Sequence, residues 1–284
     1  MLPTREVLPM TERRLKMMWS DTPEGFNLFY LLIHGRNLPE HALQWMYAAY
    51  KERKKKRGII WEAFAGSSKT TTGMTFLAYQ IGLYPHKSNL VIQVSDDIAR
   101  DNTAGVAQMI EHNPAWRIPF PHVVPSIEKS DEGEKGQKGW GAAGYNVRRA
   151  DMSNFEWSRL ISDRKDPTFI GLGRTSRSIQ GKHPNGVLYI DDIDDENTTA
   201  SDRQRTMTQK LLTGTIFPRM TPDTWAIVSG TPWTMNDSIA YMKATKSFGH
   251  CFTPIYTDGK PTWPKKFPES EIAAIRERTG ELEF

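Results

Sequence analysis

Cysteine is almost absent from this chain of 284 residues, which contains only Cys251. A single cysteine excludes an internal disulfide and a metal cluster held by several thiolates. The 7 histidines are scattered without the spacing of metal ligands, so we predict no zinc site. No run approaches the roughly 20 apolar residues that span a bilayer, and residues 1–6 lack the apolar core of a signal peptide. We therefore expect a soluble, intracellular protein without a membrane partner.

The net charge is only +4, and the excess of positive charge lies near the N-terminus. Residues 1–57 hold eleven Lys or Arg against six acids, whereas the remainder holds twenty-six against twenty-seven. Much of the excess lies in the basic run 51–57, which could neutralise the phosphates of a nucleic acid. The alternative is a solvated helix end, where cations complement the helix dipole, and one short basic run favours this alternative.

Apolar patterning predicts strands that alternate with helices, which implies a mainly parallel sheet covered on both faces. The predicted strands are 58–64, 90–95, 168–173, 187–191, 225–229 and 251–256. The predicted helices are 69–83, 98–111, 201–212 and 238–246, with Ser95 and Asp96 as capping candidates before the second of them. Residues 1–57 are expected to be helical, with one helix starting at Pro39. Residues 126–145, rich in Gly, Lys and Glu, are expected to form a mobile loop.

The segment 58–71 predicts a loop that cradles phosphates. An apolar strand leads into small residues, and Lys69 and Thr70 then open a helix, which is the order of the pattern G-x-x-x-x-G-K-[ST]. Loop amides hold the phosphates in that pattern, the lysine reaches the terminal ones, and the hydroxyl binds magnesium. Ala63 and Ser68 occupy the two glycine positions, so an ordinary strand and helix joined by a small-residue turn is the alternative. The predicted phosphate-binding residues are Ala63, Ala65, Gly66, Ser67, Ser68, Lys69, Thr70 and Thr71.

A second buried-strand pattern, 187–191, ends in two acids. Because ligands bind at the carboxyl ends of parallel strands, Asp191 is predicted to bind magnesium together with Thr70. Asp192 is predicted to act as the base that polarises an attacking water. The alternative, in which acids cap a helix or face solvent, suits residues 194–196 better.

A third buried-strand pattern, 225–233, ends in small polar residues and a proline. Its tip is expected beside the phosphates, where Ser229, Gly230 and Thr231 could sense the terminal phosphate and transmit its loss to the rest of the domain. Turn chemistry at a strand end would also produce these residues. Three such strand ends in this order favour the phosphate-linked interpretation.

These motifs, in their order and spacing, resemble the ATPase domain of phage large terminases, the motors that drive viral DNA into a procapsid. The resemblance is carried by residues 66–70, 189–192 and 229–233, and by 263–284, which looks like the stretch leading into the nuclease domain. It implies an α/β fold, a P-loop NTPase of the ASCE type with a mainly parallel central sheet flanked by helices. It also implies an N-terminal helical or lid subdomain (1–57), an ATPase core (58–258) and a linker (259–284), with DNA cleavage expected only in a longer protein.

The sequence departs from the family at two points. Many terminases have an arginine in the phosphate loop where this chain has Ala65. Arg174 and Arg177 are therefore candidates for an arginine finger acting in trans, with backbone or surface pairing as their alternative role. Asp192 stands where many relatives have the longer Glu, so Glu196 is the substitute base.

The resemblance implies an enzyme that hydrolyses ATP with Mg²⁺ and translocates double-stranded DNA. Gln44 and Trp45 could bind or stack on the adenine, although a tryptophan on an apolar helical face is more often part of a core. The implied partners are DNA, a portal protein and a small terminase subunit, in a homo-oligomeric ring at the procapsid portal in the host cytoplasm, with a monomer in isolation. Two other functions stay open: a helicase-like translocase, and a nucleotide-binding scaffold with little hydrolysis.

Overall fold

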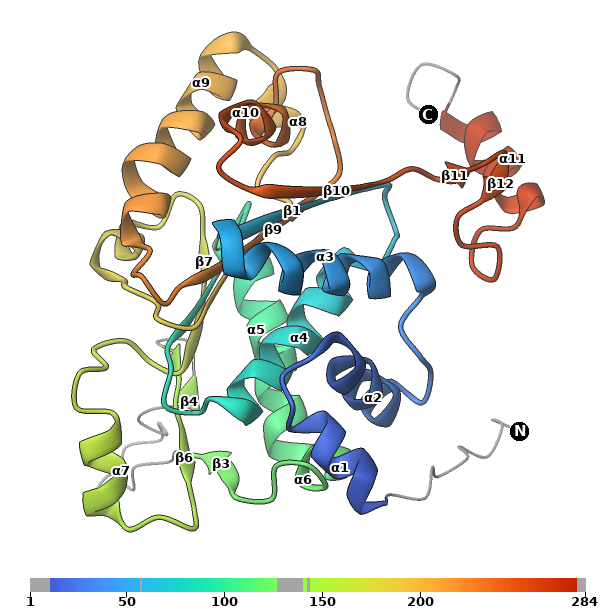
Figure 1. The fold of residues 1–284 in the computed structure, drawn as a ribbon. Helices are drawn as coiled ribbons and strands as arrows, with labels where there is room; N and C mark the ends of the chain where they lie inside the picture. The colour runs from blue at the N-terminus through green and yellow to red at the C-terminus, as the bar shows by residue number, and fades with distance from the viewer. Residues whose placement is uncertain (1–10, 57, 127–139, 142–143, 280–284) are drawn as a thin grey trace.

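The computed structural model of the chain describes residues 11–56, 58–126, 140–141 and 144–279. Its centre is an eight-stranded sheet in the order β10-β1-β9-β8-β2-β7-β5-β4. The pairs from β10 to β7 are parallel, whereas β5 and β4 add an antiparallel edge. Helices cover both faces of the sheet (Figure 1), so the predicted α/β fold with a mainly parallel central sheet is confirmed.

The strands of the central sheet are β1 (Gly58–Ala63), β2 (Asn89–Gln93), β4 (Trp140–Gly141), β5 (Gly144–Tyr145), β7 (Phe169–Gly173), β8 (Val187–Asp191), β9 (Trp225–Gly230) and β10 (Gly249–Thr253). Two small ribbons pair β3 (Val123–Pro125) with β6 (Val147–Arg149), and β11 (Tyr256–Thr257) with β12 (Lys260–Pro261). The α-helices are α1 (Glu12–Met18), α2 (Pro23–His34), α3 (Glu40–Lys56), α4 (Lys69–Leu83), α5 (Asp96–His112), α6 (Pro114–Arg117), α7 (Asn154–Leu160), α8 (Glu196–Thr199), α9 (Asp202–Leu211), α10 (Ser238–Thr245) and α11 (Glu269–Thr279). Single turns of other helix types are η1 (Arg177–Gly181), η2 (Leu212–Ile216) and η3 (Phe217–Arg219).

Several predicted boundaries shift for local reasons. The strand predicted to reach residue 95 ends at Gln93, because the Ser95 side chain accepts a hydrogen bond from the backbone N–H of Ile98 and caps α5. The strand predicted at 251–256 runs from Gly249 to Thr253, because this is the stretch that pairs with β1. Most of the loop predicted at 126–145 lies outside the described residues, and its described part includes β4 and β5 rather than loop alone.

The sheet separates two hydrophobic clusters. Ile59, Trp61 and Ala63 of β1 contribute to the cluster that also contains buried residues of α2, α3 and α4. Ile60 contributes to the opposite cluster, with residues of α10 and η2. Because successive strand residues point to opposite faces, the continuous apolar pattern of these strands means that both faces are covered.

The N-terminal helices pack directly on the central sheet. Phe26 of α2 and Trp45 of α3 are fully buried in the same cluster as Trp61 of β1. The C-terminal segment with β11, β12 and α11 lies beyond the end of β10 (Figure 1). The division of the chain after residues 57 and 258 stays a prediction. Across the described ranges, no helix combines the length and the apolar composition that a bilayer span requires.

Candidate phosphate-binding site

The loop between β1 and α4 has the backbone of a tight turn. Gly66 adopts a φ of 76° and Ser68 a φ of 73°, both in the left-handed region. A residue with a Cβ atom is strained there by about 1–2 kcal/mol, which explains why the standard pattern has glycine where this chain has Ser68. The loop then enters α4 at Lys69, so the first amides of the helix lack intrahelical acceptors and face the loop.

Lys69 is buried, with 5% of its surface exposed. Its Nζ atom donates to the carbonyl oxygen of Ala63 at 3.1 Å and to Thr231 Oγ1 at 2.8 Å. Burial lowers the pKa of Lys69, and the nearby charges of Asp192 and Asp191 oppose that shift. The lysine predicted from the loop and the hydroxyl predicted from the third strand are therefore in direct contact.

Asp191, at the end of β8, accepts hydrogen bonds on both carboxylate oxygens. Thr70 Oγ1 donates to Oδ2 at 2.7 Å, and Gln93 Nε2 donates to the same oxygen at 3.0 Å. Tyr189 OH donates to Oδ1 at 3.0 Å, and the Ser229 hydroxyl donates to it as well. A carboxylate beside a threonine hydroxyl is the kind of oxygen-rich donor set that Mg²⁺ prefers, so these residues fit that ion.

Asp191 and Asp192 lie in different electrostatic environments. Burial, followed by the neighbouring charge of Asp192, raises the pKa of Asp191 from 3.8 to about 6. Asp192 is partly exposed, has a φ of 42°, and accepts a hydrogen bond from the backbone N–H of Thr231 at 3.2 Å. A strained, partly exposed carboxylate next to a buried one is an arrangement often found at functional sites.

Sheet order explains why these segments meet. Strand β9 lies between β1 and β8, and Ser229 pairs in register with Trp61 on one side and with Asp191 on the other. Because the strands are parallel, their carboxyl ends all open at one edge of the sheet. The loop after Thr231 is in turn held by Asp237, whose carboxylate accepts the backbone N–H of Trp233 at 2.8 Å.

Other residues at the loop were not predicted. His41 Nε2 lies 3.0 Å from the carbonyl oxygen of Ser67, and Lys266 Nζ donates to the carbonyl oxygen of Gly66 at 2.7 Å. A Cβ atom at Gly66 would lie 2.9 Å from the Phe267 ring. Within the described part of the chain, Ser67 Oγ and His41 Nδ1 are buried without a hydrogen-bond partner. Buried polar atoms of this kind beside the loop fit a site built for a polar ligand.

Trp45, which the sequence offered as a residue that could stack on adenine, lies in the core, and that role stays a prediction. Its side chain is fully buried, its ring stacks on Trp61 at 5.6 Å between centroids, and its Nε1 donates to Thr253 Oγ1 at 2.8 Å. Gln44, one residue earlier on α3, is exposed, so the two side chains lie on different faces of the helix.

The two candidate finger residues and the substitute base lie outside the hydrogen bonds around Asp191. Arg174 donates to Thr208 Oγ1 at 2.9 Å, and Arg177, at the start of η1, is exposed. Glu196 is exposed at the first position of α8, whose N-cap is Asp195. The roles of these three residues stay predictions.

Searches against protein-family models and against curated proteins found no match. Comparison with solved structures finds the large terminase ATPase domain of Thermus phage P74-26. A point mutant of that domain superposes with a TM-score of 0.57 and 12% sequence identity, covering 89% of this chain and 92% of the other. A structure of the same domain without the mutation has a TM-score of 0.52 and 12% identity, covering 90% and 93%. This chain is therefore similar in fold to the ATPase domain of a phage large terminase, as the sequence motifs predicted.

Proposed function

We propose that this chain is an ATP-hydrolysing motor domain that moves double-stranded DNA during viral genome packaging. The observation that carries the proposal is the meeting of three strand ends: Thr70 Oγ1 lies 2.7 Å from Asp191 Oδ2, and Lys69 Nζ lies 2.8 Å from Thr231 Oγ1. An ammonium, a hydroxyl and a carboxylate in that relation are the groups that bind a nucleoside triphosphate with its metal ion. The fold similarity to a terminase ATPase domain supports the choice of ATP and DNA as substrates.

The residues of the site divide the work of binding and chemistry. The loop amides and Lys69 bind the phosphates of ATP, and Thr70 and Asp191 provide the oxygen ligands for Mg²⁺. When bound, Mg²⁺ neutralises negative charge on the phosphate oxygens. Asp192 orients the attacking water, with Glu196 as the substitute for that role. Because no arginine stands in the phosphate loop, one must come from elsewhere.

Arg174 or Arg177 is proposed to supply that positive charge to the site of a neighbouring subunit. Arg177 is exposed, as a residue that reaches a partner must be. This proposal implies a homo-oligomeric ring, with DNA in its channel, a portal protein and a small terminase subunit as partners. Loss of the terminal phosphate would change the contacts of Lys69 and Thr231, and the β9 end at Ser229 and Gly230 would transmit that change.

The test is a comparison of phosphate release by the wild type, Lys69→Ala and Lys87→Ala. Lys69 contacts the loop and the β9 end, so its removal should abolish turnover, whereas Lys87, whose ammonium lies 5.5 Å from the Tyr84 ring, serves as the control. The assay should include DNA and protein concentrations that allow self-association, because a finger from a neighbour is absent from a dilute monomer. Turnover of Lys69→Ala at the wild-type rate would reject the assigned site.

Two further outcomes separate the other functions. Strand displacement on a forked duplex by the wild type would favour a helicase-like translocase. ATP binding without phosphate release, even with DNA and at high protein concentration, would favour a nucleotide-binding scaffold.

A further inference from the structure

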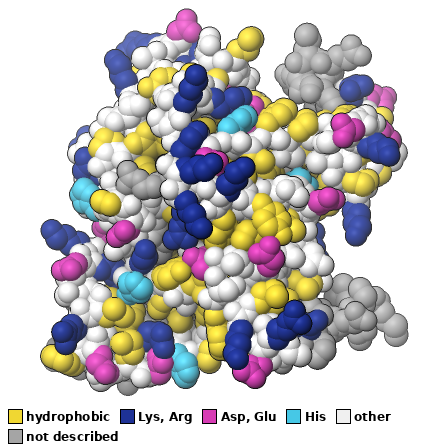
Figure 2. All heavy atoms as spheres, viewed as in Figure 1, with side chains coloured by type: hydrophobic (Ala, Val, Ile, Leu, Met, Phe, Trp, Pro, Cys, Tyr) yellow, Lys and Arg dark blue, Asp and Glu magenta, His cyan; other side chains and the backbone are white. Residues whose placement is uncertain are grey.

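Strand β10 forms an exposed edge of the central sheet, and basic side chains gather along it. Figure 2 shows Lys and Arg side chains in a band that runs from α10 across β10 to α3. The residues that these elements contribute, called here the edge patch, are Lys51, Lys55 and Lys56 of α3, Lys243 of α10, Lys246 directly after it, and His250 of β10.

Three separate segments are brought together at this edge by packing contacts. Lys56 Nζ donates to the carbonyl oxygen of Phe248 at 3.2 Å. A Cβ atom at Gly249 would lie 2.3 Å from Glu52 Cγ, so α3 packs directly against the start of β10. Lys51 and Lys55 are four residues apart and share one face of α3. A solvated helix end would account for the lysines of α3 alone, but not for their convergence with α10 and β10.

Acids neutralise only part of the patch. Among the ion pairs of the described residues, none includes Lys51, Lys55 or Lys246, and all three are exposed. Glu52 packs against Gly249, and Glu62 is buried. An exposed surface with this charge attracts a polyanion, and lysines bind backbone phosphates as point charges without reading sequence.

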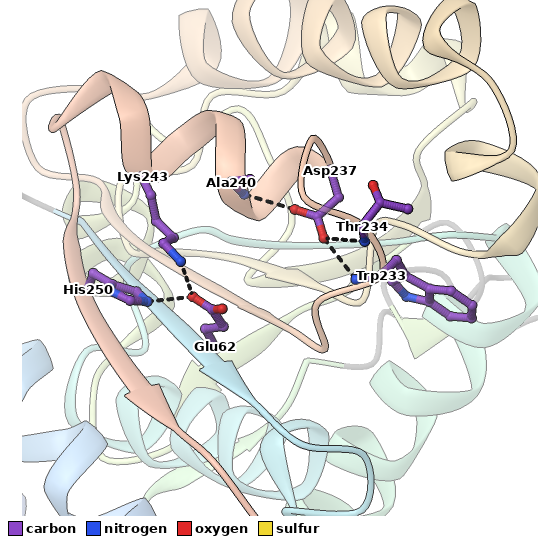
Figure 3. Close-up of polar contacts among 7 residues, drawn as sticks. All are labelled: Glu62, Trp233, Thr234, Asp237, Ala240, Lys243 and His250. Carbon is purple, nitrogen blue, oxygen red and sulfur yellow. Dashed lines mark hydrogen bonds and ion pairs between the residues drawn. The ribbon is translucent and has the colours of Figure 1, made fainter. Parts of the chain in front are cut away.

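Ion pairs also connect the patch to β1, the strand that leads into the phosphate loop. Glu62 of β1, with 8% of its side chain exposed, accepts Lys243 Nζ at 2.8 Å and lies 2.6 Å from His250 Nε2 on the same carboxylate oxygen (Figure 3). The next residue is Ala63, whose carbonyl oxygen accepts Lys69 Nζ. A polyanion on the patch would therefore contact Lys243 and His250, which pair with Glu62. The residue after Glu62 contacts Lys69, the lysine proposed to bind the nucleotide.

We propose that the edge patch binds the phosphate backbone of double-stranded DNA and is the surface through which DNA stimulates ATP hydrolysis. This inference rests on the proposed function, because a DNA-translocating motor must hold its track without regard to base sequence. An acidic surface of another protein is the competing occupant, and protection of an exposed sheet edge by lysines is the competing explanation.

The test measures binding of a short, fluorescently labelled DNA duplex to the intact chain over a series of salt concentrations. The variant Lys51→Ala/Lys55→Ala/Lys246→Ala removes three exposed charges that do not contact the phosphate loop. Each lysine that neutralises a phosphate contributes about 0.9 to the slope of log K against log salt, so the slope should fall by about 3 and the affinity near ~0.1 M salt on the order of 100-fold. Stimulation of ATP hydrolysis by DNA should fall in parallel, while hydrolysis without DNA stays at the wild-type rate.

The matched control is Arg159→Ala/Lys165→Ala/Lys260→Ala, which removes the same charge from exposed positions outside α3, α10 and β10. It should keep most of the wild-type affinity and slope. If ATP hydrolysis depends on Lys69 but the patch variant binds DNA like the control, the inference is overturned and the proposed function stands. If the patch variant keeps its DNA affinity but loses binding to an acidic protein or aggregates, the patch has one of the competing roles and the inference is again overturned.

Discussion

The substitution Trp45→Leu tests whether the tryptophan of α3 belongs to the core or to the nucleotide site. The ring is fully buried, stacks on Trp61 with an interplanar angle of 20°, and meets His41 edge-on at 5.1 Å. Its Nε1 donates a hydrogen bond of 2.8 Å to Thr253 Oγ1. Leucine can fill part of the volume but restores neither the aromatic contacts nor the hydrogen bond.

The expected loss of stability follows from these contacts. The stacked pair contributes about 1 kcal/mol beyond its burial, the hydrogen bond about 1 kcal/mol, and the volume that leucine leaves unfilled about another 1 kcal/mol. The free energy of unfolding should therefore fall by about 3 kcal/mol, measured by urea denaturation. At a temperature where the variant is folded, its KM for ATP should equal that of the wild type.

The neighbouring Gln44→Ala provides the control, because Gln44 is exposed and its removal should change the free energy of unfolding by less than about 0.5 kcal/mol. A tenfold rise in KM for ATP in Trp45→Leu, with an unchanged urea midpoint, would refute the reasoning. That result would mean that the tryptophan leaves the core to meet the base.

Three other predictions concern the loop and the site beneath it. Ser68→Gly removes the backbone strain of a φ of 73°, so it should raise the free energy of unfolding by about 1 kcal/mol, measured by thermal unfolding, without loss of ATP turnover. A lower unfolding temperature than that of the wild type would show that Ser68 is not strained. Gly73→Ala places a Cβ atom 2.1 Å from the Tyr189 ring, so it should lower stability by about 1–3 kcal/mol and slow turnover, and a neutral effect in both assays would show that the ring moves freely. Burial raises the pKa of Asp191 from 3.8 to about 6, so the protonated carboxyl group stabilises the folded state. This contribution to the free energy of unfolding is complete below pH 3.8 and is lost as the pH rises through about 6. In the presence of a chelator, the free energy of unfolding of the wild type should fall by about 1 kcal/mol more than that of Asp191→Asn between about pH 5 and about pH 8, measured by urea denaturation. Parallel pH profiles of this free energy in the two proteins would contradict the prediction.

Local sequence patterns were sufficient to predict the strands and helices that carry the candidate site residues. The buried strands have continuous apolar runs, Asp191 is the polar residue that closes one of them, and Lys69 begins the helix that follows another. Both signals depend on neighbours within a few residues, so they can be recognised without the fold. The α/β class and the set of strand ends followed from them.

Contacts between distant segments could not be recognised in this way. Gln93 reaches Asp191 only because β2 lies beside β8, and His41 reaches Ser67 only because α3 packs over the end of β1. Neither residue stands in a motif. Trp45 shows the same limit, since an apolar helical face does not indicate which partner will cover it.

The sequence by itself determined which segments form buried strands, where each strand ends, and which polar groups stand at those ends, because periodicity and turn chemistry are local properties. Only the tertiary structure decided that β9 lies between β1 and β8, and thus that Lys69 meets Thr231 and Thr70 meets Asp191. It also decided that lysines of α3 and α10 share one sheet edge. The physical reason is that strand order depends on how both faces of the sheet are buried, which involves residues far apart in the chain.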